Sequence, residues 1–418
     1  MFLTKILKYH TLKPWMTTQT KNILDLSIKG ASGCHYILKN NQKIVDFTSG
    51  LMVTNLGHNH SYLNYKMKYF IDQGLLFSPP SILIDEREKL SERLLNISGN
   101  KGGKVFYTNG GADANESALY FAHSFSQEKK RILRFEKSFH GGSSYISSYL
   151  GGDKRRNHKL GHFDLDFYQD NILPNPKMSD GGQESLNRIE QLFQKEHQNI
   201  SGILIEGSSG TGGIYTYPKN YLDSLGQLVK KYDILLIMDE VMSGFGRTGK
   251  FFGFQNSNVQ PDMITMAKGL TNGNIPMGGV ILSPKMVKQF EDNIVWNGLT
   301  YSGHPLSSAT ANACLDLYTN NENEIINRSD YLGKILNTQL KILKEKYPDK
   351  ILDVRGLGLL TCIEFKENYL GKVVSELPKK NIFAFSNENN LFISPPLIIE
   401  EELMIETLNK IEDIIFRV

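Results

Sequence analysis

The chain has 418 residues, of which 40% are hydrophobic and 22% charged, and its net charge is +3. This composition is typical of a globular protein with a sizeable core and one or two domains. The small charge gives no support for a nucleic-acid-binding protein. Three isolated cysteines, Cys34, Cys314 and Cys362, argue against a disulfide scaffold or structural zinc and favour a reducing compartment.

The N-terminal segment MFLTKILKYHTLKPWM contains several lysines, and Thr4 and Lys5 interrupt its apolar stretch. It is therefore a poor secretory signal. We predict a short arm that packs on the body of the protein or on a second subunit. No apolar run reaches the roughly 18 residues of a membrane span, so we expect a cytoplasmic location.

Two kinds of pattern follow along the chain. The segments 35–50 and 351–418 mix hairpin-like strands with helices, and we expect them to join in a small domain. Between them, short apolar runs alternate with longer helical patterns. The predicted strands lie at 104–108, 131–135, 200–206, 234–240, 262–268 and 278–283, and the predicted helices at 114–125, 185–197 and 221–232. This alternation predicts an α/β domain with a mainly parallel sheet covered on both faces.

The apolar run Ile234–Met238 leads directly into two carboxylates, Asp239 and Glu240. Burying a carboxylate costs several kcal/mol unless a partner meets it, by roughly the 2–7 kcal/mol scale of polar burial. Ligands in such folds bind beyond the carboxyl ends of the strands, where Asp239 is expected. One interpretation is an ATPase, because Gly244–Lys250 matches G-x-x-x-x-G-K. However, Phe251 follows where serine or threonine is needed, and the loop comes after the acidic strand.

A second interpretation starts from Lys268, which ends an apolar segment 29 residues after Asp239 and precedes a glycine. A lysine at the ligand edge of a sheet can have a lowered pKa and form a Schiff base. Pyridoxal phosphate needs such a lysine, an acid for its ring nitrogen and a nest for its phosphate. The turn Asn109–Ala112 between a strand and a helix could supply the nest. A plain turn, with Asp113 or Asn115 capping the helix, is the alternative.

With these residues in place, the sequence resembles the class III aminotransferases, a subgroup of the fold-type I pyridoxal-phosphate enzymes. The resemblance covers nearly the whole chain and follows the family order. The matching segments are FTSGLMVTNLGHNH, TNGGADANESA, SFHGG, DEVMSGFGRTGKFFGF, PDMITMAKGLTNGNIPMGGV, GLTYSGHPLSSATANACLDLY, VRGLGLLTCIEF and PPLIIEEEL. The resemblance implies a large domain with a seven-stranded, mainly parallel sheet, at residues 61–304. Residues 1–60 would form an arm and part of the small domain, which residues 305–418 complete.

The resemblance also implies the cofactor, pyridoxal 5'-phosphate, and the groups that hold its two ends. Lys268 would be the Schiff-base lysine and proton shuttle, and Asp239 would pair with the pyridine nitrogen. Gly111 and Ala112 would donate backbone N–H groups to the phosphate. Thr300 would reach the phosphate of a neighbouring subunit, which makes a homodimer necessary for a complete site.

Further residues would surround the ring of the cofactor. Phe139 would stack on one face, Val241 would pack on the other, and Glu206 would lie near the edge. We interpret His140 as a hydrogen-bonding residue beside Phe139. His58 and His60 complete no metal-ligand set with carboxylates or cysteines, so we expect no metal site, and we interpret Arg247 as structural.

Three departures from the family pattern bear on the substrate. Ala112 stands where serine or threonine is common, and Thr211 stands where members using 2-oxoglutarate have a glutamate. The arginine that pairs with that glutamate is also absent, because residues 387–393 read NENNLFI. The chain therefore looks closest to taurine–pyruvate and other ω-amino acid–pyruvate aminotransferases. Arg155 or Arg156 could hold the carboxylate or sulfonate of the substrate.

Two other functions remain open from the sequence. One is a pyridoxal-phosphate enzyme that does not transaminate, such as a racemase, mutase or decarboxylase. The other is a catalytically idle relative that only binds a ligand or partner. The intact pair Lys268 and Asp239 counts against the idle relative.

Overall fold

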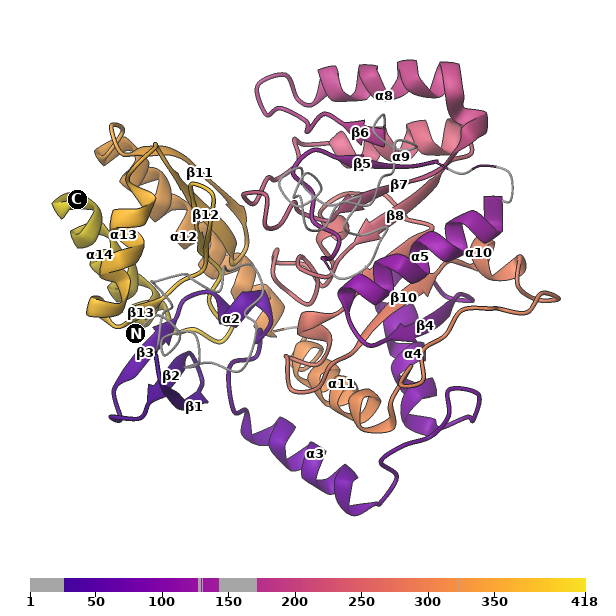
Figure 1. Ribbon diagram of the computed structural model, residues 1–418, viewed down its shortest axis with the longest axis horizontal. Helices are drawn as coiled ribbons and strands as arrows, with labels where there is room; N and C mark the ends of the chain where they lie inside the picture. Colours follow the sequence, from indigo (N-terminus) through magenta and orange to yellow (C-terminus); the bar gives the residue numbers. More distant parts are fainter. Residues whose placement is uncertain (1–25, 127–128, 130, 143–170, 323) are drawn as a thin grey trace, which may run out of the picture.

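The structure is a computed structural model that describes residues 26–126, 129, 131–142, 171–322 and 324–418. It consists of a large domain built on one sheet and a small domain built on two sheets (Figure 1). Within the described residues, no helix is long and apolar enough to cross a membrane.

The sheet of the large domain has seven strands in the order β4-β10-β9-β8-β7-β5-β6. Their bounds are β4 Lys104–Thr108, β5 Arg131–Phe135, β6 Ile172–Leu173, β7 Ile200–Glu206, β8 Leu235–Asp239, β9 Met263–Met266 and β10 Gly278–Leu282. The strands from β9 to β6 are parallel, and β10 is antiparallel to both β9 and β4. The predicted seven-stranded, mainly parallel sheet is confirmed.

Both faces of this sheet are covered, because successive side chains of a strand point to opposite sides. In β8, Leu235 and Ile237 pack with helix α5 (Gly111–Ser126), whereas Leu236 and Met238 belong to the core on the other face. Helices α8 (Gln183–Glu196) and α9 (Tyr221–Lys231) supply apolar residues to that second core. The continuous apolar runs of the central strands follow from this two-sided burial.

The small domain joins the two ends of the described chain, as predicted. Its first sheet has the order β1-β2-β3-β13, with β1 Ile28–Ser32, β2 His35–Leu38, β3 Lys43–Asp46 and β13 Ile382–Phe383. Its second sheet has the order β11-β12-β15-β14, with β11 Ile351–Leu357, β12 Leu360–Phe365, β14 Ser386–Asn387 and β15 Asn390–Ile393. Helices α12 (Glu324–Lys346), α13 (Leu370–Glu376) and α14 (Glu401–Arg417) pack beside these sheets (Figure 1).

The remaining described helices are short or lie around the large domain: α2 Ser49–Met52, α3 Ser61–Asp72, α4 Asp85–Ser98, α10 Pro284–Lys288, α11 Pro305–Tyr318, and the 3-10 turns η2 His197–Asn199, η3 Gly253–Asn256, η4 Lys268–Leu270 and η5 Leu377–Lys380. Helix α11 packs on α3 and α4, where Arg93 pairs with Asp316 at 2.9 Å. The domain boundaries at 60 and 304 stay predictions.

Arg247 connects the two domains from a fully buried position. Its Nε donates to Oδ1 of Asn55 at 2.9 Å, and its Nη1 donates to the carbonyls of Ser394, at 3.1 Å, and Pro395. Burial lowers the pKa of Arg247 to about 10. The Gly244–Lys250 loop therefore carries an interdomain contact, and the segment after it is a 3-10 turn instead of the helix that a phosphate-binding loop requires.

Candidate active site

Three parallel strands end side by side at one edge of the large sheet. The strand register places Glu206 of β7 opposite Asp239 of β8, and Asp239 opposite Thr265 of β9. Lys268 follows three residues after Thr265, at the start of η4. The carboxyl ends of parallel strands meet at this edge, so the topology alone collects two acids and an amine there.

Asp239 is buried, with 4% of its surface exposed, and its carboxylate is held by three donors. Nδ2 of Asn115 and Nδ1 of His140 lie 2.8 and 2.7 Å from Oδ2, and the backbone N–H of Val241 lies 3.0 Å from Oδ1. An ionised carboxylate offers about four acceptor positions. These contacts fix the position of Asp239 and leave acceptor capacity for one further donor.

The side chain of Asn115 is itself fixed on both sides. Its Nδ2 also donates to the carbonyl of His140 at 2.8 Å, and its Oδ1 accepts from the hydroxyl of Thr265 at 2.7 Å. The sequence offered Asn115 only as a helix cap, and Thr265 was not singled out. An amide at the fifth position of a helix that follows a glycine-rich loop at the sheet edge is the signal that could have indicated this role.

Glu240, the second carboxylate at the end of this strand, has its own hydrogen-bond partners. It is buried, and its oxygens accept from the hydroxyl of Ser243 at 2.6 Å and from the backbone N–H groups of Gly253 and Phe254 at 2.7 and 2.8 Å. Burial raises the pKa of Glu240 to about 7 against these hydrogen bonds. Glu240 therefore anchors the loop that follows β8, and Asp239 alone serves the sheet edge.

Glu206 is also buried, and its two oxygens accept from the backbone of two loops. Gly210 N–H lies 2.8 Å from Oε1, and Phe139 N–H lies 3.3 Å from Oε2. Burial raises the pKa of Glu206 to about 7; His140 opposes the rise, and Asp239 adds to it. Glu206 thus joins the 137–142 loop to the 206–215 loop beside the ends of β7 and β8.

We expect Glu206→Gln to remove part of the pH dependence of stability in the cofactor-free protein. The folded-state pKa of Glu206 is raised from 4.5 to about 7, so its contribution is fully present below pH 4.5 and is lost as the pH rises to 7. At ~1.4 kcal/mol per pKa unit, this loss is roughly 3 kcal/mol. Urea unfolding at pH 5 and pH 8 measures it.

The control for this experiment is the exposed Glu184→Gln, which should leave the pH dependence of unfolding unchanged. The Glu206→Gln protein should lose less stability than the wild type between the two pH values. An equal loss in both proteins would contradict a buried, raised carboxyl at this position.

Lys268 has a left-handed backbone conformation, with φ of 45°, which is uncommon for a residue with a side chain. Burial lowers its pKa to about 8, although the nearby carboxylates Asp239 and Glu206 oppose the change. Gly269 serves packing instead of ligand approach, because an added Cβ would lie 2.6 Å from Nδ2 of Asn55 and 2.8 Å from Cβ of Phe245. An amine that loses its proton near pH 8 can act as a base or nucleophile.

The glycine-rich turn leads into α5, as predicted, and Val241 contacts it. An added Cβ at Gly111 would lie 2.7 Å from Cγ1 of Val241, whereas one at Gly110 would meet nothing within 4 Å. Helix α5 begins at Gly111, so the free N–H groups of its first turn, including that of Ala112, face the site. Such a helix N-terminus is suited to a phosphate.

Thr300, Arg155 and Arg156 are the predicted partner and substrate residues. Thr300 is exposed on the segment before α11. Within the described residues, no hydrogen bond joins it to the residues named above. Arg155 and Arg156 fall outside the described residues. His58, by contrast, lies in the small domain, with Nε2 at 2.7 Å from Asp46.

These residues fit pyridoxal phosphate. A buried carboxylate with one free acceptor position suits a protonated ring nitrogen, and a desolvated lysine suits the aldehyde. The start of α5, where only glycine fits against Val241, suits the phosphate.

The aminotransferase class-III family matches residues 15–415, which is nearly the whole chain. The protein is a class III aminotransferase. It is therefore an enzyme that uses pyridoxal phosphate, and the predicted family, cofactor and fold type are confirmed.

Relatives of this aminotransferase act on several substrates. The mitochondrial acetylornithine aminotransferase of Candida glabrata is 31% identical over 88% of this chain and 85% of its own. A mitochondrial gamma-aminobutyrate transaminase of Oryza sativa subsp. indica is 29% identical over 91% of this chain and 79% of its own. The structure is similar to that of taurine:2-oxoglutarate aminotransferase from Bifidobacterium kashiwanohense in complex with PLP and glutamate. The TM-score is 0.89 at 30% identity, over 98% of this chain and 96% of that one.

Proposed function

We propose that this aminotransferase moves an amino group from an ω-amino acid or another primary amine to an oxo acid, with pyruvate as the first candidate acceptor. The observation that carries the proposal is the placement of Lys268 and the buried Asp239 beside each other at one sheet edge. A donor and an acceptor that use one site in turn give ping-pong kinetics.

Each residue of the site has a defined task in the proposed reaction. Pyridoxal phosphate, when bound, supplies an aldehyde carbon for the amine and a ring that withdraws electrons from the substrate carbon. Lys268, whose pKa burial lowers to about 8, would hold and move the proton of the substrate carbon as general base and acid. Asp239 would pair with the ring nitrogen, and His140 and Asn115 hold Asp239 in place.

Phe139 and Val241 are proposed to confine the ring between them. The backbone of Phe139 is fixed to Glu206, and Val241 is fixed both to Asp239 and against Gly111. These two side chains would thus restrict the position of a bound ring beside Lys268.

We propose pyruvate over 2-oxoglutarate as acceptor because the glutamate–arginine pair expected of enzymes that use 2-oxoglutarate is absent here. Thr211 stands where a glutamate would pair with an arginine, and the segment opposite it contains Asn387. Nδ2 of Asn387 donates to the backbone carbonyl of Thr211 at 2.9 Å, which is a neutral contact. The solved relative named for 2-oxoglutarate makes that oxo acid the competing acceptor.

A panel of donors tests the proposal. Taurine, β-alanine, 4-aminobutyrate and diamines are each combined with pyruvate or 2-oxoglutarate, and alanine or glutamate formation is measured. Alanine formation with at least one donor supports the proposal. Product without any oxo acid would indicate a racemase, mutase or decarboxylase. The lack of any spectral change with every donor would indicate an idle site.

We also propose a homodimer, supported by an exposed apolar patch. The patch consists of Leu75, Leu76, Phe77, Ile82, Leu83, Ile294, Trp296 and Tyr301. Its two segments lie together, since the Phe77 and Tyr301 rings are 6.1 Å apart and Arg87 donates to the carbonyls of Ile82 and Gly303. Large exposed apolar patches mark interaction sites. Thr300 directly precedes Tyr301 of this patch, which suits its predicted contact with the neighbouring phosphate.

We expect the double variant Leu83→Asp, Trp296→Asp to be monomeric and to lose most of its activity. The two side chains are 73% and 82% exposed in one chain, and burying each is worth roughly 1.5–3 kcal/mol. A two-fold dimer contains both changes twice. Sedimentation and cofactor retention measure the result. Phe416→Asp, which replaces a residue 70% exposed on α14, is the control, and a dimeric, fully active double variant would contradict the proposal.

The location of the enzyme is proposed from its cysteines. Cys34, Cys314 and Cys362 are all buried and unpaired. Free thiols of this kind suit a reducing compartment such as the cytoplasm, and cell fractionation tests this location.

A further inference from the structure

We propose that Lys137, oriented by the hydroxyl of Tyr215, binds the acid group of the substrate and so selects for amines and oxo acids that carry a carboxylate or sulfonate. This inference rests on the proposed function. It assigns the recognition of the acid to residues that the structure describes.

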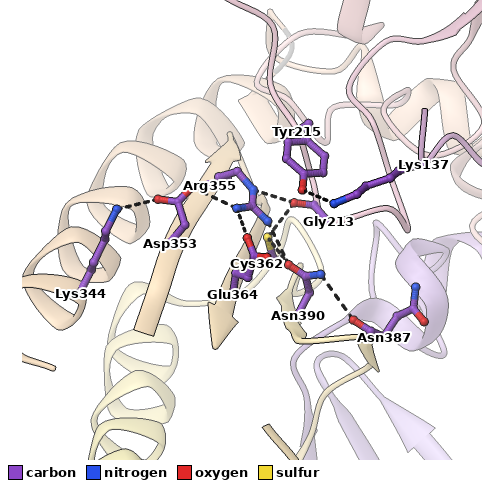
Figure 2. Close-up of polar contacts among 10 residues, drawn as sticks. All are labelled: Lys137, Gly213, Tyr215, Lys344, Asp353, Arg355, Cys362, Glu364, Asn387 and Asn390. Carbon is purple, nitrogen blue, oxygen red and sulfur yellow. Dashed lines mark hydrogen bonds and ion pairs between the residues drawn. The ribbon is translucent and has the colours of Figure 1, made fainter. Parts of the chain in front are cut away.

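Lys137 extends its side chain to Tyr215. Its side chain is exposed, and its Nζ donates to the hydroxyl of Tyr215 at 3.1 Å and lies 5.3 Å from the centre of the Tyr215 ring (Figure 2). In the described residues it has no hydrogen bond or ion pair with a carboxylate. Glu364 and Glu388 act only at longer range and, with the Tyr215 hydrogen bond, raise the pKa of Lys137. The lysine therefore carries a positive charge whose nearest partner is neutral.

Arg355 lies on the other side of Tyr215 and is already neutralised. Its guanidinium is 4.5 Å from the centre of the Tyr215 ring and donates to Asp353 and Glu364. It also donates to the carbonyl of Gly213 and to Oδ1 of Asn390, both at 3.0 Å. Four of its five N–H donors are thus committed to the protein, and Arg355 holds the 210–215 turn through Gly213.

A count of charges in this group leaves one cation over. Figure 2 shows three cations, Lys137, Lys344 and Arg355, with two carboxylates, Asp353 and Glu364. Lys344 pairs with Asp353 at 2.7 Å on the side away from Tyr215. Among the residues drawn, the cation without a carboxylate partner is therefore Lys137; Glu388, outside this group, acts on it only at longer range, so a carboxylate or sulfonate could pair with it directly.

Lys137 is also tied to the active site through its backbone. Two residues later, the N–H of Phe139 donates to Glu206, and Gly210 donates to the other oxygen of the same carboxylate. The turn that follows is packed against Lys137, since an added Cβ at Gly212 would lie 2.2 Å from its carbonyl oxygen. The backbone of Lys137 thus lies between Phe139 and the turn at Gly212, both of which connect to Glu206, and its side chain extends to Tyr215.

The backbone conformation of Lys137 also supports a ligand-binding role. Its φ of 55° is left-handed, which is rare for a residue with a side chain. Strain of this kind persists where the surroundings enforce it, often at ligand-binding positions. Here the backbone of Lys137 packs against Gly212, and its side chain donates to Tyr215.

Binding of amine-free acids by the holoenzyme tests the proposal. Isethionate is the sulfonate probe and 3-hydroxypropanoate the carboxylate probe; neither can react as a donor. Isothermal titration gives Kd for the wild type, Lys137→Gln, Lys137→Arg and Tyr215→Phe. We expect Lys137→Gln to weaken binding about tenfold to a hundredfold, the loss of one charged hydrogen bond. Lys137→Arg should keep the affinity within about threefold, and Tyr215→Phe should fall between them.

Lys372→Gln is the matched control, because Lys372 is also exposed and lies 5.4 Å from the centre of a tyrosine ring, that of Tyr369. A kinetic comparison adds a second measurement. With pyruvate as acceptor, Lys137→Gln should lower kcat/KM for β-alanine but change that for propylamine less than about threefold, because propylamine has no acid group to lose.

Three results would overturn the proposal. They are equal affinity of wild type and Lys137→Gln for both probes, no binding of either probe to the wild type, and an equal loss of kcat/KM for both amines. If no donor transfers an amino group but Lys137→Gln still weakens binding of the probes, the acid site stands and the proposed transamination fails.

Discussion

Replacing Lys268 by alanine is expected to abolish amino transfer and the visible absorbance of the lysine-bound cofactor. Lys268 is the amine that the structure places beside Asp239 and Glu206, with its pKa lowered to about 8 by burial. It has two tasks in the proposed reaction, so its loss removes both the attachment of the cofactor and the proton transfer. The proton transfer alone is worth about 10²–10⁴ in rate. Alanine formation from pyruvate and the absorption spectrum measure the two effects.

The control is Lys250→Ala, which removes an exposed lysine from the loop after Asp239. It should keep both the spectrum and the rate. A Lys268→Ala protein that retained the visible band would show that another amine holds the cofactor. Lys268→Arg is a second test, because it keeps the charge but cannot lose its proton, and it should be as inactive as the alanine variant.

The second large effect is expected from Asp239→Asn. Asparagine has nearly the same shape, but it removes the charge that would hold a proton on the ring nitrogen. It also turns an amide N–H₂ toward Asn115 and His140, which are donors now 2.8 and 2.7 Å away. We expect kcat to fall by about 10²-fold or more, as for the loss of one preorganised charge contact at a reacting centre. Steady-state kinetics and retention of the cofactor on gel filtration measure the change.

Asp233→Asn is the control, because Asp233 is exposed just before β8, whereas Asp239 ends that strand. It should leave kcat unchanged. Asn115→Ala should have an effect in the same direction as Asp239→Asn but smaller, since His140 and Val241 still hold the carboxylate. Full activity of Asp239→Asn would remove the basis of the proposed mechanism.

The large sheet was predictable because it is buried on both faces. Each central strand reads as a continuous apolar run, and β4, β5 and β7 have the predicted bounds. The short edge strand β6 was missed, since Ile172–Leu173 is only two residues long and has no periodicity to recognise. The direction of β10 was not predicted either, because the sequence of an apolar strand does not show whether it pairs parallel or antiparallel with its neighbours.

The residues of the site differ in how far the sequence alone could indicate their roles. Asp239 and Lys268 each end an apolar run, so their roles can be recognised from the sequence alone. Asn115 and Thr265 became relevant only when folding brought residues 150 positions apart to 2.7 Å. Lys137 and Tyr215 were missed for the same reason, because a lysine and a tyrosine 78 positions apart have no sequence signal in common.

Arg247 limits how the enzyme can open for its substrates. Its guanidinium is buried and donates to backbone carbonyls of the small domain and to the side chain of Asn55. A hinge movement that separated Ser394 and Pro395 from Arg247 would leave a buried cation without these acceptors. Each charged hydrogen bond lost in this way costs roughly 1.5–3 kcal/mol. Opening of the enzyme by such a hinge is therefore unfavourable, and we expect donors to enter and leave while the large sheet and the small domain keep their contact through Arg247.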